Sequence, residues 1–210
     1  MADAPDAAQR EVADGWVGAI ESAGLPVAWT EGARPRPRIA FGAPLPIGMA
    51  ANAELIDVVI CERWPAWRVR DALKGFVPTG WRLAELHDVW LAGPPLAGRV
   101  AAADYEVLLA DDPPLDRLNQ AAADLLAAPA LPRRRSRGDA SVEYDLRPLL
   151  IDVTVVAGEP PRVLTRTRFH PELGTGRPEE VVAALAERAG VGLEIASVVR
   201  DRLVLVEDLA

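Results

Sequence analysis

Strand-like and helix-like segments alternate along the second half of this chain, and their order is the strongest constraint on its fold. Leucines repeat at helical spacing over residues 115–127, and a second helical segment at residues 177–190 opens with a proline and closes with a glycine. Segments with strand patterning surround these helices at residues 104–110, 141–148, 151–156, 162–169 and 201–207. In the strand expected at residues 141–148, the alternation of apolar and polar residues predicts that Val142, Tyr144 and Leu146 point inward. This order predicts a βαββαβ arrangement of the ferredoxin-like type.

The first half of the chain has a similar order but a different start. A helical stripe of apolar residues spans residues 4–23, so the first helix begins almost at the first residue. We expect a further helix and several strands after it, the helix at 65–75 and the strands at 27–30, 38–41, 54–62 and 81–90. The sequence therefore predicts an α+β fold of two ferredoxin-like (βαββαβ-type) halves, residues 1–91 and 100–210. The first half lacks its opening strand, and the junction lies near residues 92–99.

Composition and charge narrow the class of protein. The 210 residues are enough to bury a core, and half of them are apolar while 26% are charged. The net charge of −8 argues against broad, nonspecific binding of nucleic acid. No apolar run reaches the roughly 18 residues that cross a bilayer. The N-terminal stretch has neither the basic nor the apolar region of a secretory signal. We therefore expect a cytoplasmic protein with no membrane partner.

Side chains that bind metals or act as nucleophiles are few. Cys61, His87 and His170 lie far apart in the sequence, so we expect no metal and no cofactor. The turn "GTGRPEE" at residues 174–180 precedes a helix and can bind an anion there. It lacks the spacing and the Lys-Ser/Thr pair of a P-loop, so an ordinary turn into a helix is favoured. No serine lies in a GxSxG motif. These absences favour binding over catalysis.

A stretch rich in proline, glycine and arginine, residues 31–48, is the main candidate for function. Its sequence is "EGARPRPRIAFGAPLPIG", with four prolines and three glycines. Prolines bias the preceding residues toward extended backbone, so the segment is stiff and loses little entropy on binding. Arg34, Arg36 and Arg38 alternate with these prolines, and their guanidinium groups suit phosphate or carboxylate. The alternative is a stiff connector with solvated arginines.

Two other arginine clusters strengthen the anion-binding hypothesis. One is the run "RRRSRG" at residues 133–138, and the other is the strand "RVLTRTRF", whose arginines share one parity and hence one face. The predicted binding residues are Arg34, Arg36, Arg38, Arg133, Arg134, Arg135, Arg166 and Arg168. Trp64 and Trp67 bracket a helix start, and exposed aromatics beside arginines can stack on unpaired bases. Packing in a core is the favoured alternative for these tryptophans, and solvated strand and loop faces remain the alternative for the arginines.

The stretch "AGLPVAWTEGARPRPRIAFGAPLPIGMAANAELIDV" at residues 23–58 resembles the core of the radical-SAM-linked (radical-SAM-associated) protein family, a domain of unknown function. "YDLRPLL" and "GTGRPEEVVAAL" resemble later motifs of that family, with Arg147, Pro148, Arg177 and Pro178. The positions that match in the first stretch are Gly32, Pro35, Pro37, Arg38, Phe41, Pro44, Leu45, Pro46, Gly48, Glu54 and Asp57. Members of the family are often fused to, or encoded beside, a radical-SAM protein. The resemblance therefore implies a radical-SAM protein as partner and a role with RNA or in presenting a substrate.

The chain departs from the family pattern at three places. Thr30 and Glu31 stand for Ser-Gln before Gly32, Arg36 stands for a loop histidine, and "AQREV" replaces a Ser-His-Leu-Asp segment. The chain also has no CxxxCxxC, so it holds no radical-SAM cluster itself. We therefore expect a non-catalytic accessory module that binds RNA or presents a substrate through an Arg/Pro-rich surface. The alternatives are a stand-alone RNA-processing enzyme and a purely structural protein-interaction domain.

Overall fold

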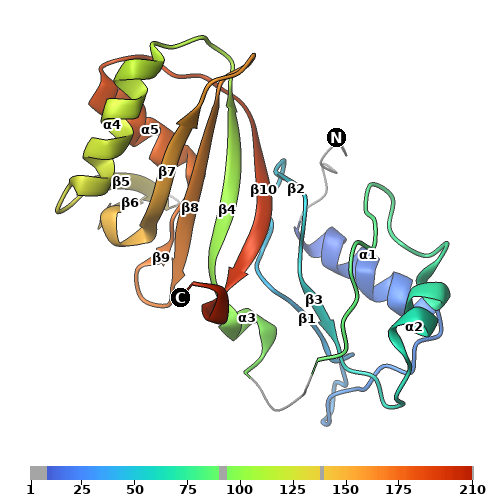
Figure 1. Cartoon of the computed structure of the whole chain (residues 1–210). Helices are drawn as coiled ribbons and strands as arrows, with labels where there is room; N and C mark the ends of the chain where they lie inside the picture. The colour runs from blue at the N-terminus through green and yellow to red at the C-terminus, as the bar shows by residue number, and fades with distance from the viewer. Residues whose placement is uncertain (1–8, 90–93, 138–139, 210) are drawn as a thin grey trace. The chain divides into compact units, whose positions relative to one another are not determined.

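The computed structural model describes residues 9–89, 94–137 and 140–209 (Figure 1). Antiparallel sheets and helices are both present, so the predicted α+β class is confirmed. The chain divides between Arg99 and Val100 into two compact units. None of the helices described in either unit is long and apolar enough to cross a membrane.

The second unit is built on long antiparallel strands that lie in the order β10-β4-β8-β7. Helix α4 follows β4 along the chain and α5 follows β8, and both helices pack on the same side of the sheet (Figure 1). The bounds of these elements are β4 Val100–Leu109, α4 Leu115–Ala127, β7 Leu150–Val156, β8 Arg162–His170, α5 Pro178–Ala189 and β10 Ile195–Leu205. The two-residue strand β9, Gly174–Thr175, pairs with β8, and a short 3-10 turn, Val206–Asp208, follows β10.

The core of the second unit lies between this sheet and the two helices. Val107 and Val163 from the strands meet Leu118, Val181 and Leu185 from the helices, and all five are fully buried. Burying a leucine or valine side chain stabilises the folded state by about 1.5–3 kcal/mol. The alternation of buried and part-exposed residues along β4 follows from the strand period of two, because only one face of the sheet meets the helices.

A hairpin of β5 (Pro132–Arg137) and β6 (Ala140–Asp145) follows α4, and it corrects two sequence predictions. The arginine run, to which the sequence assigned no element, forms β5 because it pairs along its length with β6. The strand predicted at 141–148 ends at Asp145, and a 3-10 turn follows at Arg147–Leu149. Val142 was expected to point inward but is exposed, since it belongs to this separate hairpin and not to the main sheet.

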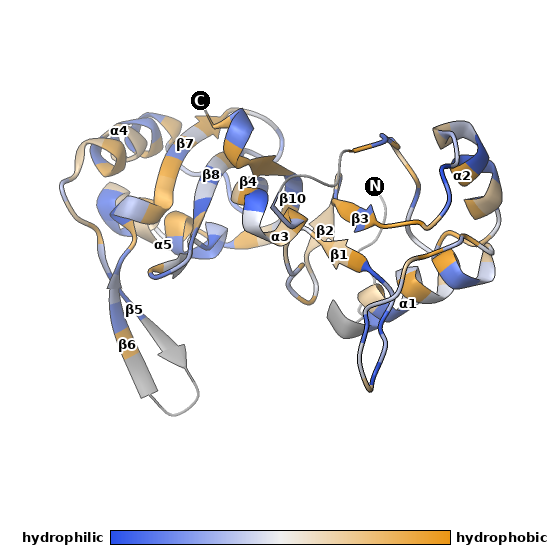
Figure 2. Cartoon of the chain, turned by 90° about the horizontal axis from the view of Figure 1, so that it is seen from below, coloured by the Kyte–Doolittle hydropathy of each residue, from blue (hydrophilic) through white to orange (hydrophobic). Residues whose placement is uncertain are grey.

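The first unit contains helices and short strands. Helix α1 spans Gln9–Ser22, and its residues Trp16 and Ile20 are buried as the helical stripe predicted. Strands β1 (Ile39–Phe41) and β3 (Ile56–Val58) form an antiparallel pair. The remaining elements are β2 Ala50–Ala51, α2 Ala66–Leu73 and α3 Leu96–Arg99. Figure 2 colours β1 as apolar and β3 as partly apolar, whereas the loop that leads into β1 is largely hydrophilic.

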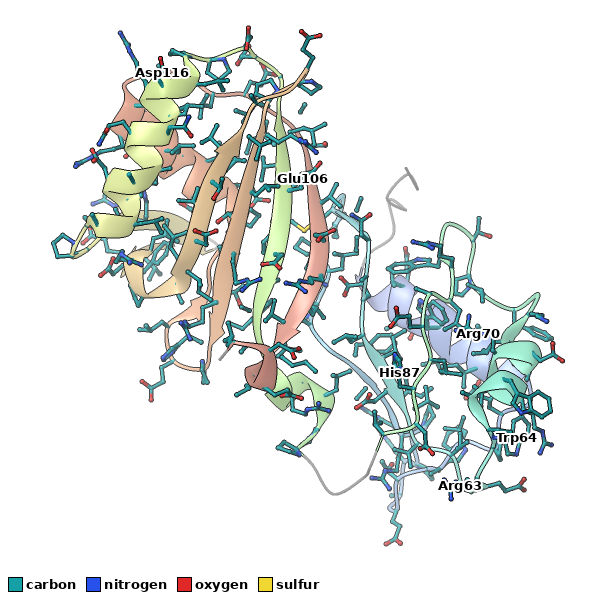
Figure 3. The ribbon with its side chains drawn as sticks, in the orientation of Figure 1. Arg63, Trp64, Arg70, His87, Glu106 and Asp116 are labelled. Carbon is teal, nitrogen blue, oxygen red and sulfur yellow. The ribbon has the colours of Figure 1, made fainter. Side chains whose placement is uncertain are left out.

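Residues 81–89 differ from the sequence prediction. They were expected to form a strand but are irregular, because side chains and not a neighbouring strand hold them. The guanidinium of Arg70 on α2 donates to the carbonyl oxygens of Leu83 and Ala84 at 3.3 and 3.2 Å (Figure 3). Trp81 packs edge-on against Trp16, with ring centroids 6.2 Å apart. Among the described residues of this unit no strand lies between α2 and α3, so the βαββαβ order predicted for the first half is not seen there.

Candidate functional site

The Arg/Pro-rich stretch folds back on the preceding residues as a closed hairpin, here called the arginine hairpin (residues 28–38). The Thr30 N–H donates to the Arg36 carbonyl at 2.8 Å, and the Arg36 N–H donates to the Thr30 Oγ1 at 2.9 Å. The Arg38 N–H donates to the Ala28 carbonyl at 2.8 Å. Gly32 turns the tip with a φ of +122°, a backbone conformation that side-chain-bearing residues rarely adopt.

The base of the arginine hairpin is tied to a third segment. The Ala28 N–H donates to the Val59 carbonyl at 2.8 Å, and the Val59 N–H donates to the Arg38 carbonyl at 3.0 Å. Ala28, Arg38 and Val59 are therefore joined pairwise by backbone hydrogen bonds. A hairpin whose two arms are both bonded at the base is pre-organised, which lowers the entropy lost when it binds a partner.

The three arginines of the hairpin project into solvent. Arg34, Arg36 and Arg38 are all exposed, and none of them forms a side-chain hydrogen bond or an ion pair with a described residue. Trp29, which pairs with Pro37 across the hairpin, is 52% exposed. In extended backbone, residues two apart lie on one side, so Arg36 and Arg38 share a face. The hairpin thus presents unpaired cations and an exposed aromatic ring together.

Two arginines on the sheet of the second unit, unlike those of the hairpin, are paired with an acidic side chain. Arg166 holds Asp104 with two hydrogen bonds, from Nε to Oδ1 at 2.6 Å and from Nη2 to Oδ2 at 2.9 Å. Arg202 donates from Nε to the same Oδ2 at 2.8 Å. Burial raises the pKa of Asp104, but the hydrogen bonds from Arg166 and Arg202 outweigh it and hold that pKa below its ordinary value. Arg166, one of the predicted binding residues, is therefore engaged with Asp104 within the protein.

We expect Asp104→Asn to destabilise the protein by about 1–3 kcal/mol at pH 7, because the arginines lose their charged acceptor. The pKa of Asp104 is lower in the folded than in the unfolded state, so its stabilisation is present above the ordinary value of 3.8 and is lost as the pH falls below it. Urea unfolding of wild type and of Asp104→Asn from pH 7 to pH 3 measures this pH dependence. The difference between them should shrink toward pH 3, and a constant difference would contradict the ion pairing.

The other predicted arginines are placed as follows. Arg133 forms an ion pair with Glu187 at 2.7 Å, and Arg134 forms one with Glu143 across the β5–β6 hairpin. Arg168 on β8 is half-buried and has no ion pair with a described residue, whereas Arg162 lies 3.5 Å from Glu106 (Figure 3). The side chain of Arg135 lies outside the described residues. Acidic neighbours thus neutralise Arg133, Arg134 and Arg166. The arginine hairpin brings together three exposed arginines without ion pairs to described residues.

The two histidines form hydrogen bonds with residues close to them in the sequence, and the cysteine is free. His170 Nδ1 accepts the N–H groups of Glu172 and Leu173 at 3.2 and 3.1 Å, which closes the turn after β8. His87 pairs with Glu85 on the surface (Figure 3), and Cys61 is exposed. Within the ranges that the structure describes, no three histidine, cysteine or acidic side chains gather as a metal site.

Two further features of the first unit bear on its function. One is a small pocket of about 70 Å³, partly open to solvent, whose walls include residues of α1, β1 and β3 and Trp81. The other is the surface of α2, where Trp67 is 71% exposed and the Arg68 guanidinium stacks over Trp64 at 3.7 Å (Figure 3). Core packing was the favoured expectation for these tryptophans, and for Trp67 it is wrong. The pocket had no sequence signal because its walls are far apart along the chain.

The sequence pattern of a family described as "Uncharacterized protein conserved in bacteria (DUF2344)" matches residues 7–181. The chain belongs to this family. No curated protein matches the chain of this DUF2344 member. A similar solved structure is the "Crystal Structure of a Cbf5-Nop10-Gar1 Complex", with 14% sequence identity and a TM-score of 0.47. That similarity covers 92% of the DUF2344 chain and 44% of the chain in the complex, so the present chain spans less than half of that length.

Proposed function

We propose that this DUF2344 protein is a non-catalytic accessory module that binds single-stranded RNA through the arginine hairpin. The observation that carries the proposal is the set of three exposed arginines without ion pairs beside the exposed Trp29. Guanidinium groups match phosphate geometry with two parallel hydrogen bonds, and an exposed aromatic ring stacks on unpaired bases. A hairpin closed by backbone hydrogen bonds holds both kinds of contact in place before RNA arrives.

The distribution of charge supports this assignment to the first unit. Residues 1–99 hold ten basic and twelve acidic side chains, a net charge of −2, whereas residues 100–210 hold thirteen and nineteen, a net charge of −6. Glu31 is the single acidic residue between Val27 and Gly48. The hairpin is thus a locally basic feature on the less acidic unit, so phosphate attraction there is not cancelled by the overall charge of −8.

The second unit is proposed to be a ferredoxin-like scaffold. Its order β4-α4-β7-β8-α5-β10 follows the βαββαβ pattern, with the β5–β6 hairpin inserted after α4. On the sheet face away from the helices, Asp104 and Glu106 bind the arginines of β8 and β10. Because those cations are already paired, we assign RNA binding to the arginine hairpin and not to this face.

The main test replaces Arg34, Arg36 and Arg38 together with alanine. Each lost phosphate contact lowers the salt slope of single-strand binding by about 0.7, so the slope should fall by about 2, with at least a tenfold loss of RNA affinity at low salt. The melting temperature should not change, because these side chains make no described contacts. Fluorescence anisotropy with a labelled RNA at several salt concentrations measures both quantities.

A control variant separates local contacts from total charge. Arg82, Arg117 and Arg177 are also exposed, and no ion pair joins them to a described residue. Replacing these three with alanine changes the net charge equally, yet should leave the salt slope of RNA binding within about 0.5 of wild type. Equal RNA affinity and equal salt slope in the folded hairpin variant and in wild type would reject the proposal.

The partner of the module is proposed to be a radical-SAM protein, on the strength of the motif at residues 23–58. Purification of the tagged native protein should bring down a protein with a CxxxCxxC motif at near-equal amounts. Recovery of RNA alone would leave the chain as an RNA-binding protein and remove the radical-SAM assignment.

A further inference from the structure

Helix α2 carries a tryptophan that the core of the first unit does not use. Trp67 lies in the first turn of α2 and is 71% exposed. The side of α2 that packs into the core carries Val69, Ala72 and Leu73. At 3.6 residues per turn, Trp67 lies on the opposite side of the helix from these three residues. Packing of the first unit therefore does not account for this indole ring.

Beside Trp67, an arginine is stacked on a second indole ring. The Arg68 guanidinium carbon lies 3.7 Å from the ring centroid of Trp64, which precedes the helix (Figure 3). Arg68 is exposed, and no ion pair joins it to a described residue. Unpaired bases stack on guanidinium planes as well as on aromatic rings. Trp67 and Arg68, which are neighbours in the chain, thus offer two surfaces for stacking.

The charge around these two surfaces is positive. Residues 62–76 hold four basic and two acidic side chains, a net charge of +2 in a chain whose net charge is −8. Both acidic side chains are engaged, because Asp71 is paired with Lys74 at 2.7 Å and Glu62 accepts the indole N–H of Trp64 at 3.2 Å. The segment therefore attracts an anionic partner.

The arginines of this segment favour a nucleic acid over an apolar protein surface. Arg63 lies 3.8 Å from Asp88, but both side chains are largely exposed, so the pair is screened by water and weak (Figure 3). An apolar surface that covered Trp67 would also remove water from Arg63 and Arg68 without supplying an acceptor, which is costly. A single-stranded nucleic acid supplies bases for stacking and phosphates for the guanidinium groups.

Helix α2 begins within reach of the arginine hairpin. The Ala28 N–H at the base of the hairpin donates to the Val59 carbonyl at 2.8 Å, and the Cys61 N–H donates to the Pro26 carbonyl at 2.7 Å. Trp64 follows Val59 by five residues, which span at most about 18 Å. A strand of about twelve nucleotides is about 40 Å long even when its bases are stacked, so one strand reaches both places.

We infer that α2 is a second contact for the RNA strand that the arginine hairpin binds, with two unpaired bases stacked on Trp67 and on the Arg68–Trp64 pair. The inference rests on the proposed RNA binding and adds base stacking to its phosphate contacts. Because every base has a flat face, this contact tolerates any sequence. Two contacts joined by one strand bind more tightly than either contact does alone.

The test compares Trp67→Ala, Trp67→Leu and Trp67→Phe in the full chain by fluorescence anisotropy with a labelled oligouridine of about twelve nucleotides. Affinity should fall at least fivefold for Trp67→Ala and Trp67→Leu, whereas Trp67→Phe keeps a ring and should lose less than threefold. The salt slope should stay at the wild-type value, because stacking releases no counterions. Melting temperatures should not change, since Trp67 lies outside the core.

Two controls separate stacking from other contacts. Ile47→Ala removes another exposed apolar side chain from the same unit and should bind oligouridine as wild type does. An abasic strand of the same length keeps its phosphates but has no bases to stack, so wild type and Trp67→Ala should bind it equally.

The outcomes distinguish this inference from the proposed function. Wild-type affinity of Trp67→Ala for oligouridine, an equal loss on the abasic strand, or a Trp67→Phe protein no better than Trp67→Leu overturns the stacking contact and leaves the arginine hairpin standing. A loss in Trp67→Ala, together with wild-type binding and salt slope in the Arg34/Arg36/Arg38 alanine variant, supports the contact on α2 and rejects the hairpin. Loss of a co-purifying protein from Trp67→Ala, with RNA affinity unchanged, overturns the inference and assigns α2 to a protein partner.

Discussion

Gly176→Ala is expected to lower the free energy of unfolding by about 2–3 kcal/mol, because a methyl group has no room at this position. A Cβ placed there would lie 2.8 Å from the Thr167 Cβ and 3.0 Å from the Leu149 carbonyl oxygen. Neither neighbour moves easily. Thr167 is fully buried, and its Oγ1 donates to the Gly176 carbonyl at 2.8 Å, while Gly176 itself donates to the Arg168 carbonyl at 3.1 Å. The turn is thereby held against β8.

Gly192→Ala is the matched control for this variant. A Cβ at Gly192 meets no atom within 4 Å, and the residue has no positive φ, so its stability should stay within about 0.5 kcal/mol of wild type. Urea unfolding followed by circular dichroism measures all three proteins. A Gly176→Ala protein as stable as Gly192→Ala would show that the turn is not packed closely against β8.

The packing of Gly176 could not be predicted from the sequence, although the helix that follows it could. The helical segment at residues 177–190 was predicted from local signals, Pro178 in its first turn and Gly190 at its end. Helix α5 spans Pro178–Ala189, and Gly190 after it has a left-handed φ of 65°. The turn before it carries no local mark of its packing, since Leu149 and Thr167 come from distant parts of the chain. The same turn was weighed as an anion site, whereas its glycine is accounted for by close contact with a carbonyl and a buried threonine.

The bounds of the elements in the second unit were predicted unevenly, since β4 and β10 begin four and six residues before the predicted starts at residues 104 and 201. Helix α4 has the predicted bounds because leucine spacing marks it, and β7 and β8 differ from prediction by one residue at an end. The arginine run of β5 has no apolar alternation, so only its pairing with β6 reveals it as a strand. The opposite error occurred at residues 81–89, where apolar alternation is present but the Arg70 guanidinium takes backbone carbonyls of the segment.

The candidate site was predictable in part for the same reason. Prolines beside Arg34 and Arg36 pointed to extended, exposed backbone, and these arginines are exposed. The sequence does not reveal which arginines are neutralised, because Asp104 and Arg166 are 62 residues apart and meet only when β4 pairs with β8. The pocket is formed in a similar way, since Glu54, Trp81 and residues of α1 line it together although they lie far apart in the sequence.

Arg147→Ala is expected to destabilise the protein by roughly 3 kcal/mol, since one guanidinium holds three backbone carbonyls. Arg147 donates to Leu126 and Leu150 at 2.8 Å each and to Ala128 at 3.2 Å. The carbonyls of Leu126 and Ala128 lie at the end of α4, where the last carbonyls of a helix lack partners and the helix dipole favours a cation. The Asp145 carboxylate accepts the backbone N–H of Arg147 at 2.9 Å and so helps to fix this residue.

Arg147→Lys separates geometry from charge in this prediction. A lysine keeps the positive charge but lacks the planar fork, so it satisfies fewer of the three carbonyls and should recover only about a third to a half of the loss. Arg117→Ala, on the exposed face of the same helix, is the control and should stay within about 0.5 kcal/mol of wild type. Thermal and urea unfolding measure each variant. RNA affinity at a temperature where all are folded should be equal, because Arg147 acts on the end of α4; a loss of RNA affinity with unchanged stability would instead assign the "YDLRPLL" motif to binding.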